Sequence, residues 1–287
     1  NSGGTITNNG FITNRTPGDE GFRNYGTLNN DGSITVNNGC KLANYGTFVN
    51  AHTGGATLTI YGSLDNIYLS GYAGSFTNNV GGSLQFFTSG RFWASTDTTN
   101  TNHGTIAIDG ASARMDLQGS LTNTGTIENL GGTFQAVNLT NTSTGVLYND
   151  LYANWTCGDS DSSMLVNEGL FTNRYALNIN HKCVFTNKSG GTLWNRGNTY
   201  IGETDGTSPR GTLFNQGSVS NDGKIILMGY TADSGVRLHN DNGAVITNSS
   251  GSTIELGLQS QLYNTGLIEH SGVIQPGSSG SGKLINY

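Results

Sequence analysis

The acidic side chains are the first candidates for chemistry. The chain of 287 residues contains 19 Asp and Glu residues and five His. Asp159 and Asp161 stand close together in a stretch of Gly, Ser and Asp, and carboxylate oxygens are ligands that calcium prefers. The Gly-Gly-x-Gly-x-Asp array of calcium-binding β-rolls is missing around them. We therefore treat this pair as weak metal candidates and expect no metal site elsewhere.

The remaining acids and the histidines indicate no catalytic site. A sugar-cleaving enzyme needs two carboxylates held at a fixed separation. The other acids show no recurrent clustering and include Asp109, Asp116, Glu128, Glu168, Glu203 and Asp205. The histidines have no metal-binding spacing, and the sequence contains neither a G-x-S-x-G elbow nor a P-loop. We expect a protein that is not an enzyme, with no catalytic residue and no cofactor.

The three cysteines, Cys40, Cys157 and Cys183, are widely separated. No C-x-x-C motif is present, which argues against a structural zinc site. Three arrangements stay open: one disulfide within the chain plus a free thiol, disulfides between molecules, or three buried unpaired thiols.

Six Asn-x-Ser/Thr sequons could accept glycans in a secreted protein. They begin at Asn14, Asn138, Asn141, Asn154, Asn187 and Asn248. A chain this rich in Asn, Ser and Thr also forms sequons by chance. Asn154 lies in a polar interruption and is the first candidate, followed by Asn14 and Asn138. Pro17 directly after Thr16 makes glycosylation at Asn14 less favourable.

A short repeat organises the stretch from Asn24 to Asn50, NYGTLNNDGSITVNNGCKLANYGTFVN. An Asn-x-Gly turn occurs four times, each time followed by a very short apolar strand. The glycines are Gly26, Gly32, Gly39 and Gly46, so the spacings are 6, 7 and 7. Such a period is too short for a helical repeat and fits a strand of three or four residues with a tight turn.

Side-chain alternation along these strands predicts which residues face inward. Residues i and i+2 share a face of a strand, so Leu28 faces with Asn30 and Phe48 faces with Asn50. A buried Asn needs hydrogen-bond partners. Stacked coils provide them, because one Asn can bond to the Asn above it and to the turn backbone. The expected turn ladder comprises Asn30, Asn38, Asn44 and Asn50, with Gly26, Gly32, Gly39 and Gly46 at the bends.

The Gly-x-apolar pattern continues through nearly the whole sequence. We expect an all-β fold, a β-solenoid or two-sheet stack of β-arches with short strands and almost no helix. The prediction is a single elongated domain over residues 1–287. Polar interruptions near 15–23, 94–103, 150–167 and 203–210 are expected to be loop insertions. The tryptophans Trp93, Trp155 and Trp194 are expected to fill the core or cover loops.

Composition excludes several classes of partner. The net charge is −6 with a pI of 5.2, so we expect no nucleic-acid partner. No apolar run approaches the roughly 18 residues of a membrane span, so we expect no membrane insertion. The repeat begins at Gly4-Thr5-Ile6 with no visible signal peptide, which suggests a processed start.

The unit Asn-x-Gly-[Thr/Ser]-[Leu/Ile/Phe]-x-Asn resembles repeat proteins at the cell surface of bacteria and archaea. These include autotransporter and filamentous adhesins and the sheath proteins of filamentous methanogens. The sheath proteins look most similar, because they are also rich in Gly, Asn and Thr and poor in charge. The resemblance implies β-arches that continue from subunit to subunit into rings of a tubular extracellular envelope. The polar interruptions depart from that pattern and imply a varying cross-section.

Function is expected to follow from the repeat. Neither end of the sequence carries a recognisable capping pattern. We therefore expect a structural protein that forms a homopolymer through its solenoid ends, as an extracellular sheath, surface layer or filament. The alternative is an adhesin or autotransporter-like passenger that binds surface glycans through its loops.

Overall fold

The computed structural model describes residues 3–15, 17, 21–69, 72–157, 163–180, 182–202, 211–229, 236–278 and 280–287. Contacts between residues divide the chain into two compact units, Asn1–Asn138 (unit 1) and Leu139–Tyr287 (unit 2), and each is described by itself. The described residues form β-strands, most of them four residues long, and no helix. The single domain expected over residues 1–287 stays a prediction.

Both units are parallel β-solenoids. Each turn of the chain, here called a rung, contributes one strand to each of three columns, and strands within a column pair in parallel and in register. Columns 1 and 3 belong to one sheet and column 2 to the other. The expected all-β solenoid with two sheets is therefore confirmed.

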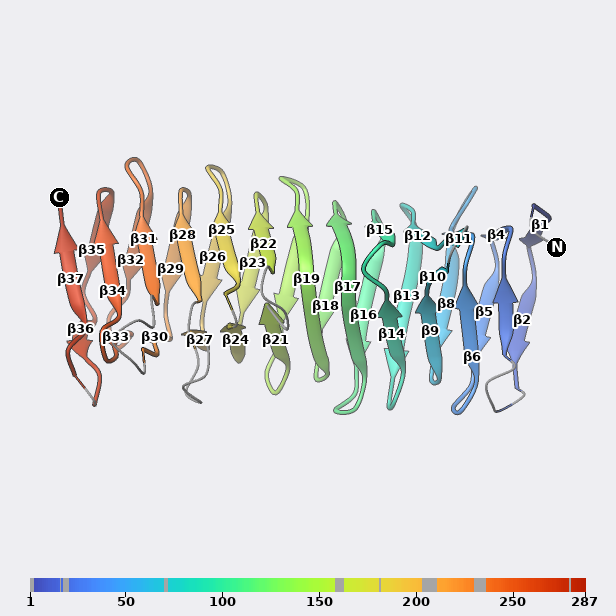
Figure 1. Cartoon of the computed structure of the whole chain (residues 1–287), viewed down its shortest axis with the longest axis horizontal. Helices are drawn as coiled ribbons and strands as arrows, with labels where there is room; N and C mark the ends of the chain where they lie inside the picture. Colours follow the sequence, from blue (N-terminus) through green and yellow to red (C-terminus); the bar gives the residue numbers. More distant parts are fainter. Residues whose placement is uncertain are drawn as a thin grey trace. The chain divides into compact units, whose positions relative to one another are not determined.

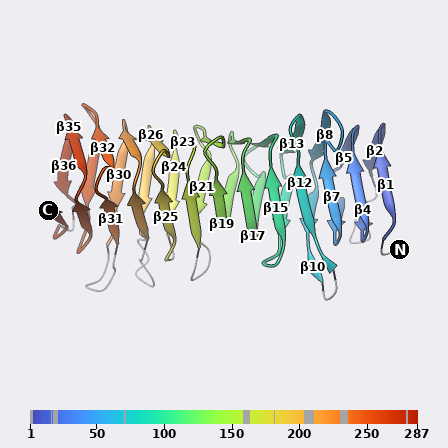
Figure 2. The same cartoon turned by 90° about the horizontal axis from the view of Figure 1, so that it is seen from above.

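In unit 1, the strands of column 1 lie side by side, as Figure 2 shows. These are β1 (Thr5–Asn8), β4 (Thr27–Asn30), β7 (Thr47–Asn50), β12 (Ser75–Asn78), β15 (Thr99–Asn102) and the second half of β17 (Arg114–Asn123). Column 2 contains β2 (Phe11–Asn14), β5 (Ser33–Val36), β8 (Ala56–Ile60), β13 (Gly82–Phe87), β16 (Thr105–Asp109) and β18 (Thr126–Asn129). Column 3 contains β3 (Phe22–Asn24), β6 (Lys41–Asn44), β9 (Ser63–Asn66), β14 (Arg91–Ala94) and the first half of β17.

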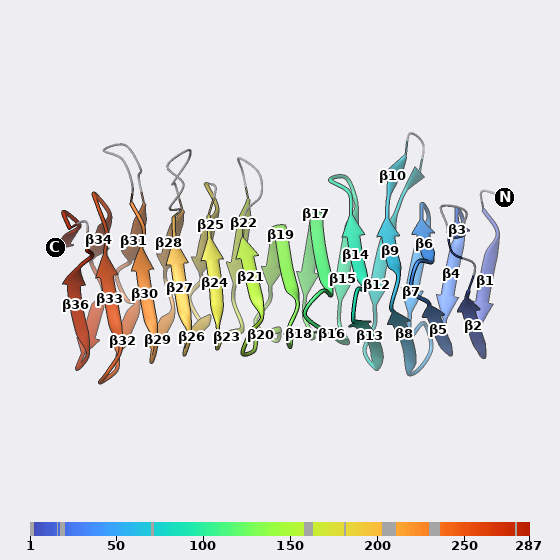
Figure 3. The same cartoon turned by 90° about the horizontal axis from the view of Figure 1, so that it is seen from below.

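Unit 2 has the same three columns. Column 1 contains β22 (Met164–Asn167), β25 (Val184–Asn187), β28 (Thr212–Asn215), β31 (Arg237–Asn240), β34 (Gln261–Asn264) and β37 (Lys283–Asn286). Column 2 contains β20 (Val146–Asn149), β23 (Leu170–Asn173), β26 (Thr192–Asn195), β29 (Ser218–Asn221), β32 (Val245–Asn248) and β35 (Leu267–His270). Column 3 is seen in Figure 3 and contains β21 (Asn154–Cys157), β24 (Ala176–Ile179), β27 (Asn198–Ile201), β30 (Lys224–Leu227), β33 (Thr253–Leu256) and β36 (Val273–Pro276).

Two further features complete the strand list. β19 (Thr133–Asn141) contains the boundary between the units. In unit 1, β10 (Tyr68–Leu69) and β11 (Tyr72–Ala73) form an antiparallel hairpin between β9 and β12. This hairpin was not predicted from the sequence. Figure 1 labels most of these strands along the chain.

The core follows from the alternation of inward and outward side chains along most strands. Apolar side chains at the second position point inward, and the Ser or Thr before them lies at the surface, as in β12 and β28. In unit 1, the rings of Phe48 and Phe76 pack edge to face with centroids 5.4 Å apart. In unit 2, Trp155 is fully buried and packs against Phe171 at 4.9 Å, which places this tryptophan in the core.

Glycines at the tight turns allow the rungs to stack. A Cβ added to Gly46 would lie 2.1 Å from the Gly26 carbonyl oxygen, and a Cβ added to Gly26 would meet the Gly4 carbonyl at the same distance. Gly32 is equally confined, whereas Gly39 is required for its φ of 73°. Close approach between rungs is therefore the main reason for glycine at these bends.

Three of the expected loop insertions overlap strands, and β3 begins at Phe22 within the interval 15–23. The interval 94–103 includes β15, because Asn100 takes an inward position that elsewhere holds an apolar residue. The interval 150–167 includes β21 and β22, with Trp155 and Leu165 inside. Residues 203–210 and part of 15–23 lie outside the described residues.

Substituting Gly46 by Ala should lower the free energy of unfolding by about 3 kcal/mol, because the new methyl group would separate two rungs. Denaturant unfolding measures this loss. Gly54→Ala is the matched control, since a Cβ there meets no atom within 4 Å and should change stability by less than about 0.5 kcal/mol. Equal effects of the two substitutions would contradict the close-stacking explanation.

Candidate functional site

The most extensive polar feature is a ladder of asparagines at the corner between columns 1 and 2, buried at every member except Asn286. Within each unit, the Asn that ends a column 1 strand donates its side-chain amide to the Asn of the next rung. The Nδ2–Oδ1 distances are 2.7–2.8 Å in unit 1, through Asn8, Asn30, Asn50, Asn78, Asn102 and Asn123. They are 2.7–2.9 Å in unit 2, through Asn141, Asn167, Asn187, Asn215, Asn240, Asn264 and Asn286.

Asn215 shows how one ladder member is satisfied. Its Nδ2 donates to Asn240 Oδ1 at 2.8 Å and to the Val245 carbonyl at 3.0 Å. Its Oδ1 accepts from Asn187 at 2.9 Å and from the Gly217 N–H at 3.3 Å. All the hydrogen-bonding capacity of the amide is used, so this fully buried side chain carries no desolvation penalty from an unpaired group.

A second ladder occupies a different corner in each unit. In unit 1 it lies between columns 3 and 1 and joins Asn24, Asn44, Asn66 and Asn100 at 2.7–2.9 Å. In unit 2 it lies between columns 2 and 3 and joins Asn149, Asn173, Asn195, Asn221 and Asn248 at 2.7–2.8 Å. Each unit thus has two ladder corners and one apolar corner. At the apolar corner, the buried side chains near the strand ends are Val36, Ile60, Phe86 and Ile108 in unit 1. In unit 2 they are Cys157, Ile179, Ile201 and Leu227.

The expected ladder positions are met by Asn30, Asn44 and Asn50, but the prediction was wrong for Asn38. Its side chain is exposed in the turn after β5. The strand ends at Val36, which takes the inward corner position instead and aligns with Ile60 of the next rung. Asn38 therefore lies at the apolar corner of unit 1. The turn there covers four residues, 37–40, and Gly39 adopts a positive φ.

Cys157 and Cys183 form a disulfide, and Cys40 is a buried free thiol. The disulfide joins the end of β21 to the residue before β25 of the next rung, at the apolar corner of unit 2. All three sulfur atoms are inside the units, because the exposed fraction of each cysteine is 3% or less. The structure thus selects a disulfide within the chain from the arrangements that the sequence left open.

The sequons differ in exposure. Asn154 begins β21 and is exposed, and Asn138 is exposed in β19. Asn14 is half-buried, and its Nδ2 donates to the Lys41 carbonyl at 2.8 Å. The other three sequons begin at fully buried ladder members, Asn141, Asn187 and Asn248. Asn154 and Asn138 therefore remain the accessible glycosylation candidates.

Charged groups form only small clusters. Asp159 and Asp161 lie outside the described residues, and within the described ranges no group of three His, Cys, Asp or Glu side chains could hold a metal ion. Hydrogen bonds from Ser249 and from the Trp194 indole lower the pKa of Asp222. The described part of the chain also contains no helical segment that could serve as a membrane span.

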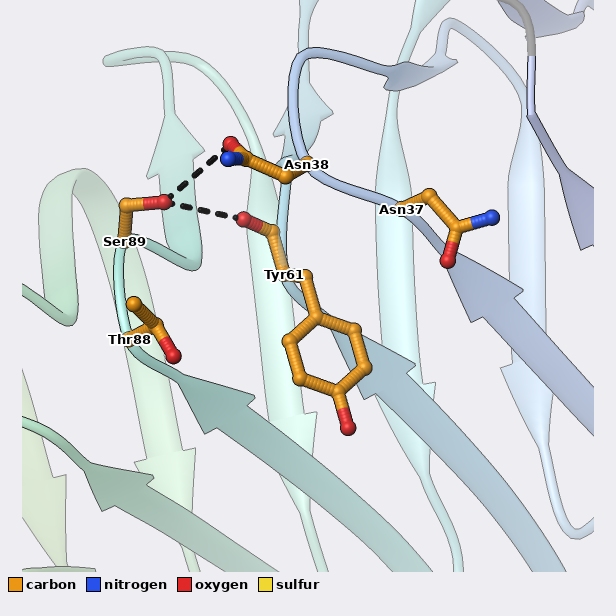
Figure 4. A pocket seen from close by; sticks show the side chains of 5 residues that line it. All are labelled: Asn37, Asn38, Tyr61, Thr88 and Ser89. Atoms are coloured by element: carbon orange, nitrogen blue, oxygen red, sulfur yellow. Dashed lines mark hydrogen bonds between the residues drawn. The ribbon is translucent and has the colours of Figure 1, made fainter.

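The surface of unit 1 is hollowed at its apolar corner. A recess of about 450 Å³ is lined by Asn37, Asn38, Tyr61, Thr88 and Ser89 (Figure 4). This recess was not predicted from the sequence. The sequence feature that accompanies the recess is the unequal length of successive turns at this corner. That difference becomes visible only when the sequences of the rungs are aligned.

No family model and no curated protein matches the sequence. Among solved structures, the chain is similar to a crystal structure of a TibA fragment hyper-glycosylated by TibC, with 18% sequence identity and a TM-score of 0.33. The match covers 99% of this chain and 94% of that one.

Asn50→Asp should lower the free energy of unfolding by about 3 kcal/mol or more at neutral pH, because it buries an unpaired charge in place of a donor. Asn38→Asp makes the same chemical change at an exposed turn and should cost less than about 0.5 kcal/mol. Burial raises the pKa of the carboxyl introduced in the ladder, so the loss should shrink as the pH falls toward about 4. Denaturant unfolding at both pH values measures these differences, and equal losses for the two variants would contradict the ladder.

Reducing the Cys157–Cys183 disulfide should lower the free energy of unfolding by about 3 kcal/mol, because it releases a constraint on the unfolded chain. Thermal unfolding with and without a reductant measures the effect. Cys40→Ala should stay sensitive to the reductant, whereas the double variant Cys157→Ala/Cys183→Ala should be insensitive. A chain that migrates as a covalent dimer on non-reducing gels would show that the cysteines pair between molecules instead.

Proposed function

We propose that this protein is a structural, extracellular β-solenoid that assembles rung on rung into a sheath, surface layer or filament. The bonding pattern between rungs supports the proposal. Each interior rung offers its neighbour parallel strand edges and two ladder asparagines. Another rung of the same kind can therefore be added with the same set of hydrogen bonds.

The bonding pattern of the interior rungs carries this proposal. Ile6 of β1 is 45% exposed and Leu284 of β37 is 49% exposed, although their register partners Leu28 and Leu262 are fully buried. A rung from a second copy would cover these side chains and pair with the strand edges of β1 and β37. The ladders are also directional, because each amide donates toward the higher-numbered rung. Head-to-tail contact would place Asn286 Nδ2 of one copy against Asn8 Oδ1 of another.

A second candidate function is an adhesin that binds surface glycans. The recess around Tyr61 favours it, because this is a hollowed surface that the stacking of rungs does not require. An adhesin would bind as a dispersed molecule, whereas a sheath protein would act as a polymer.

Negative-stain electron microscopy of the purified chain should show polymers whose formation is blocked by Ile6→Lys, since a charge would then lie in the rung–rung contact. Thr13→Lys is the control, because it adds the same charge on an exposed position of the same rung. A wild-type chain that stays monomeric at high concentration would contradict assembly through these edges.

A further inference from the structure

The apolar corner of unit 1 has turns of unequal length on three successive rungs. The turns cover residues 37–40 after β5, 61–62 after β8 and 88–90 after β13. The middle turn is the shortest, so it projects less from the solenoid than the turns on either side. A hollow is left between those two longer turns. Gly62 permits this tight turn, since a Cβ there would lie 2.2 Å from the Cys40 carbonyl oxygen.

Tyr61 is the side chain of the short turn. Its ring stacks on Phe87 of the next rung with centroids 5.6 Å apart and planes 25° apart, which fixes its orientation. On the preceding rung the smaller Asn37 follows Val36, the register partner of Ile60, and lines the same recess. The Tyr61 ring is thus supported by another ring on one side only, and the residue is 37% exposed.

Polar groups surround the ring on both sides. Figure 4 shows Tyr61 between the Asn37–Asn38 turn and the Thr88–Ser89 turn. Ser89 Oγ lies 3.3 Å from Asn38 Oδ1 and 3.2 Å from the Tyr61 carbonyl oxygen. Amide and hydroxyl groups at these positions can donate and accept hydrogen bonds in more than one direction.

A second hollow of about 500 Å³ shares Asn38, Tyr61 and Ser89 with the first, so Tyr61 contributes to both. It extends onto the outer face of column 3, where its lining includes Lys41, Asp65 and Arg91.

The charges in this second hollow are paired. Lys41 Nζ lies 2.6 Å from Asp65 Oδ2, and Arg91 Nε lies 3.2 Å from Asp116 Oδ2. Beyond them, the half-buried Trp93 is in register with Asp65 on one side and Asp116 on the other. A second aromatic side chain therefore lies on the same face as these ion pairs.

We propose that this surface, the Tyr61 recess together with the adjoining hollow, binds a linear neutral oligosaccharide. The apolar C–H face of a pyranose ring loses contact with water when it packs on an aromatic ring. The sugar hydroxyl groups match the amides, hydroxyls and ion pairs that line the two hollows. Since each cation already has a carboxylate partner, the surface favours a neutral sugar over an anionic one. The inference supplies a ligand class for the adhesin candidate and does not depend on assembly.

The test is isothermal titration calorimetry with four probes: the β-1,4-linked hexaoses of glucose, mannose, xylose and N-acetylglucosamine. At least one should bind with a Kd below about 1 mM. Tyr61→Ala should weaken that binding at least tenfold, and Tyr61→Phe should retain most of it because the ring remains. Tyr68→Ala is the matched control, since Tyr68 is similarly exposed on the hairpin strand β10.

A further variant separates binding from folding. Ser89→Ala removes an exposed hydroxyl from the recess and should weaken the sugar severalfold while leaving the unfolding transition unchanged. The proposal is overturned if none of the four hexaoses binds, or if Tyr61→Ala binds the best of them as tightly as the unaltered chain. Tyr61→Ala should form polymers as the unaltered chain does. If the unaltered chain does not assemble, that result counts against the structural role and not against this site.

Discussion

The constraint on which the structure depends is that a buried asparagine must satisfy its whole amide group. At the ladder corners, each interior side chain is buried and is bonded to the asparagines of the rungs before and after it. Such bonding is available only if successive strands are in register. A slip by one residue would turn every ladder amide outward and bring Ser or Thr into the core. The ladders therefore specify the register that the small apolar side chains alone would specify weakly.

The same constraint explains the composition. A ladder Asn followed by a two-residue turn requires glycine wherever the backbone of the next rung approaches closely, as at Gly26 and Gly46. Surface positions on short parallel strands favour Ser and Thr over charged side chains, because like charges would repeat at every rung. Turns differ in length at the ladder corners as well, and the third corner of each unit is distinguished by its apolar inward side chains. The Tyr61 recess of unit 1 and the Cys157–Cys183 disulfide of unit 2 both lie at that corner.

Much of this fold could be predicted from the sequence, because its period and its alternation are local signals. The strand at Thr27–Asn30 and the inward orientation of Asn30, Asn44 and Asn50 follow from spacing alone. The role of Asn38 did not, since an Asn-x-Gly turn looks the same at a ladder corner and at an apolar one. The strand β15 was also missed, because Asn100 replaces an apolar residue inside and gains its partners only from another rung. Two features depend on which residues of successive rungs are aligned: the pairing of Cys157 with Cys183 and the recess at Tyr61. That alignment cannot be read from a short stretch of sequence.

Hydrogen exchange of the asparagine side-chain amides tests the ladders most directly. In a two-dimensional NMR spectrum of the folded chain in deuterated water, the Nδ2 protons of interior members such as Asn50 should persist long after those of exposed Asn38 have exchanged. Exchange of the Asn50 and Asn38 amides at the same rate in the folded protein would contradict the claim that buried amide ladders hold the rungs in register.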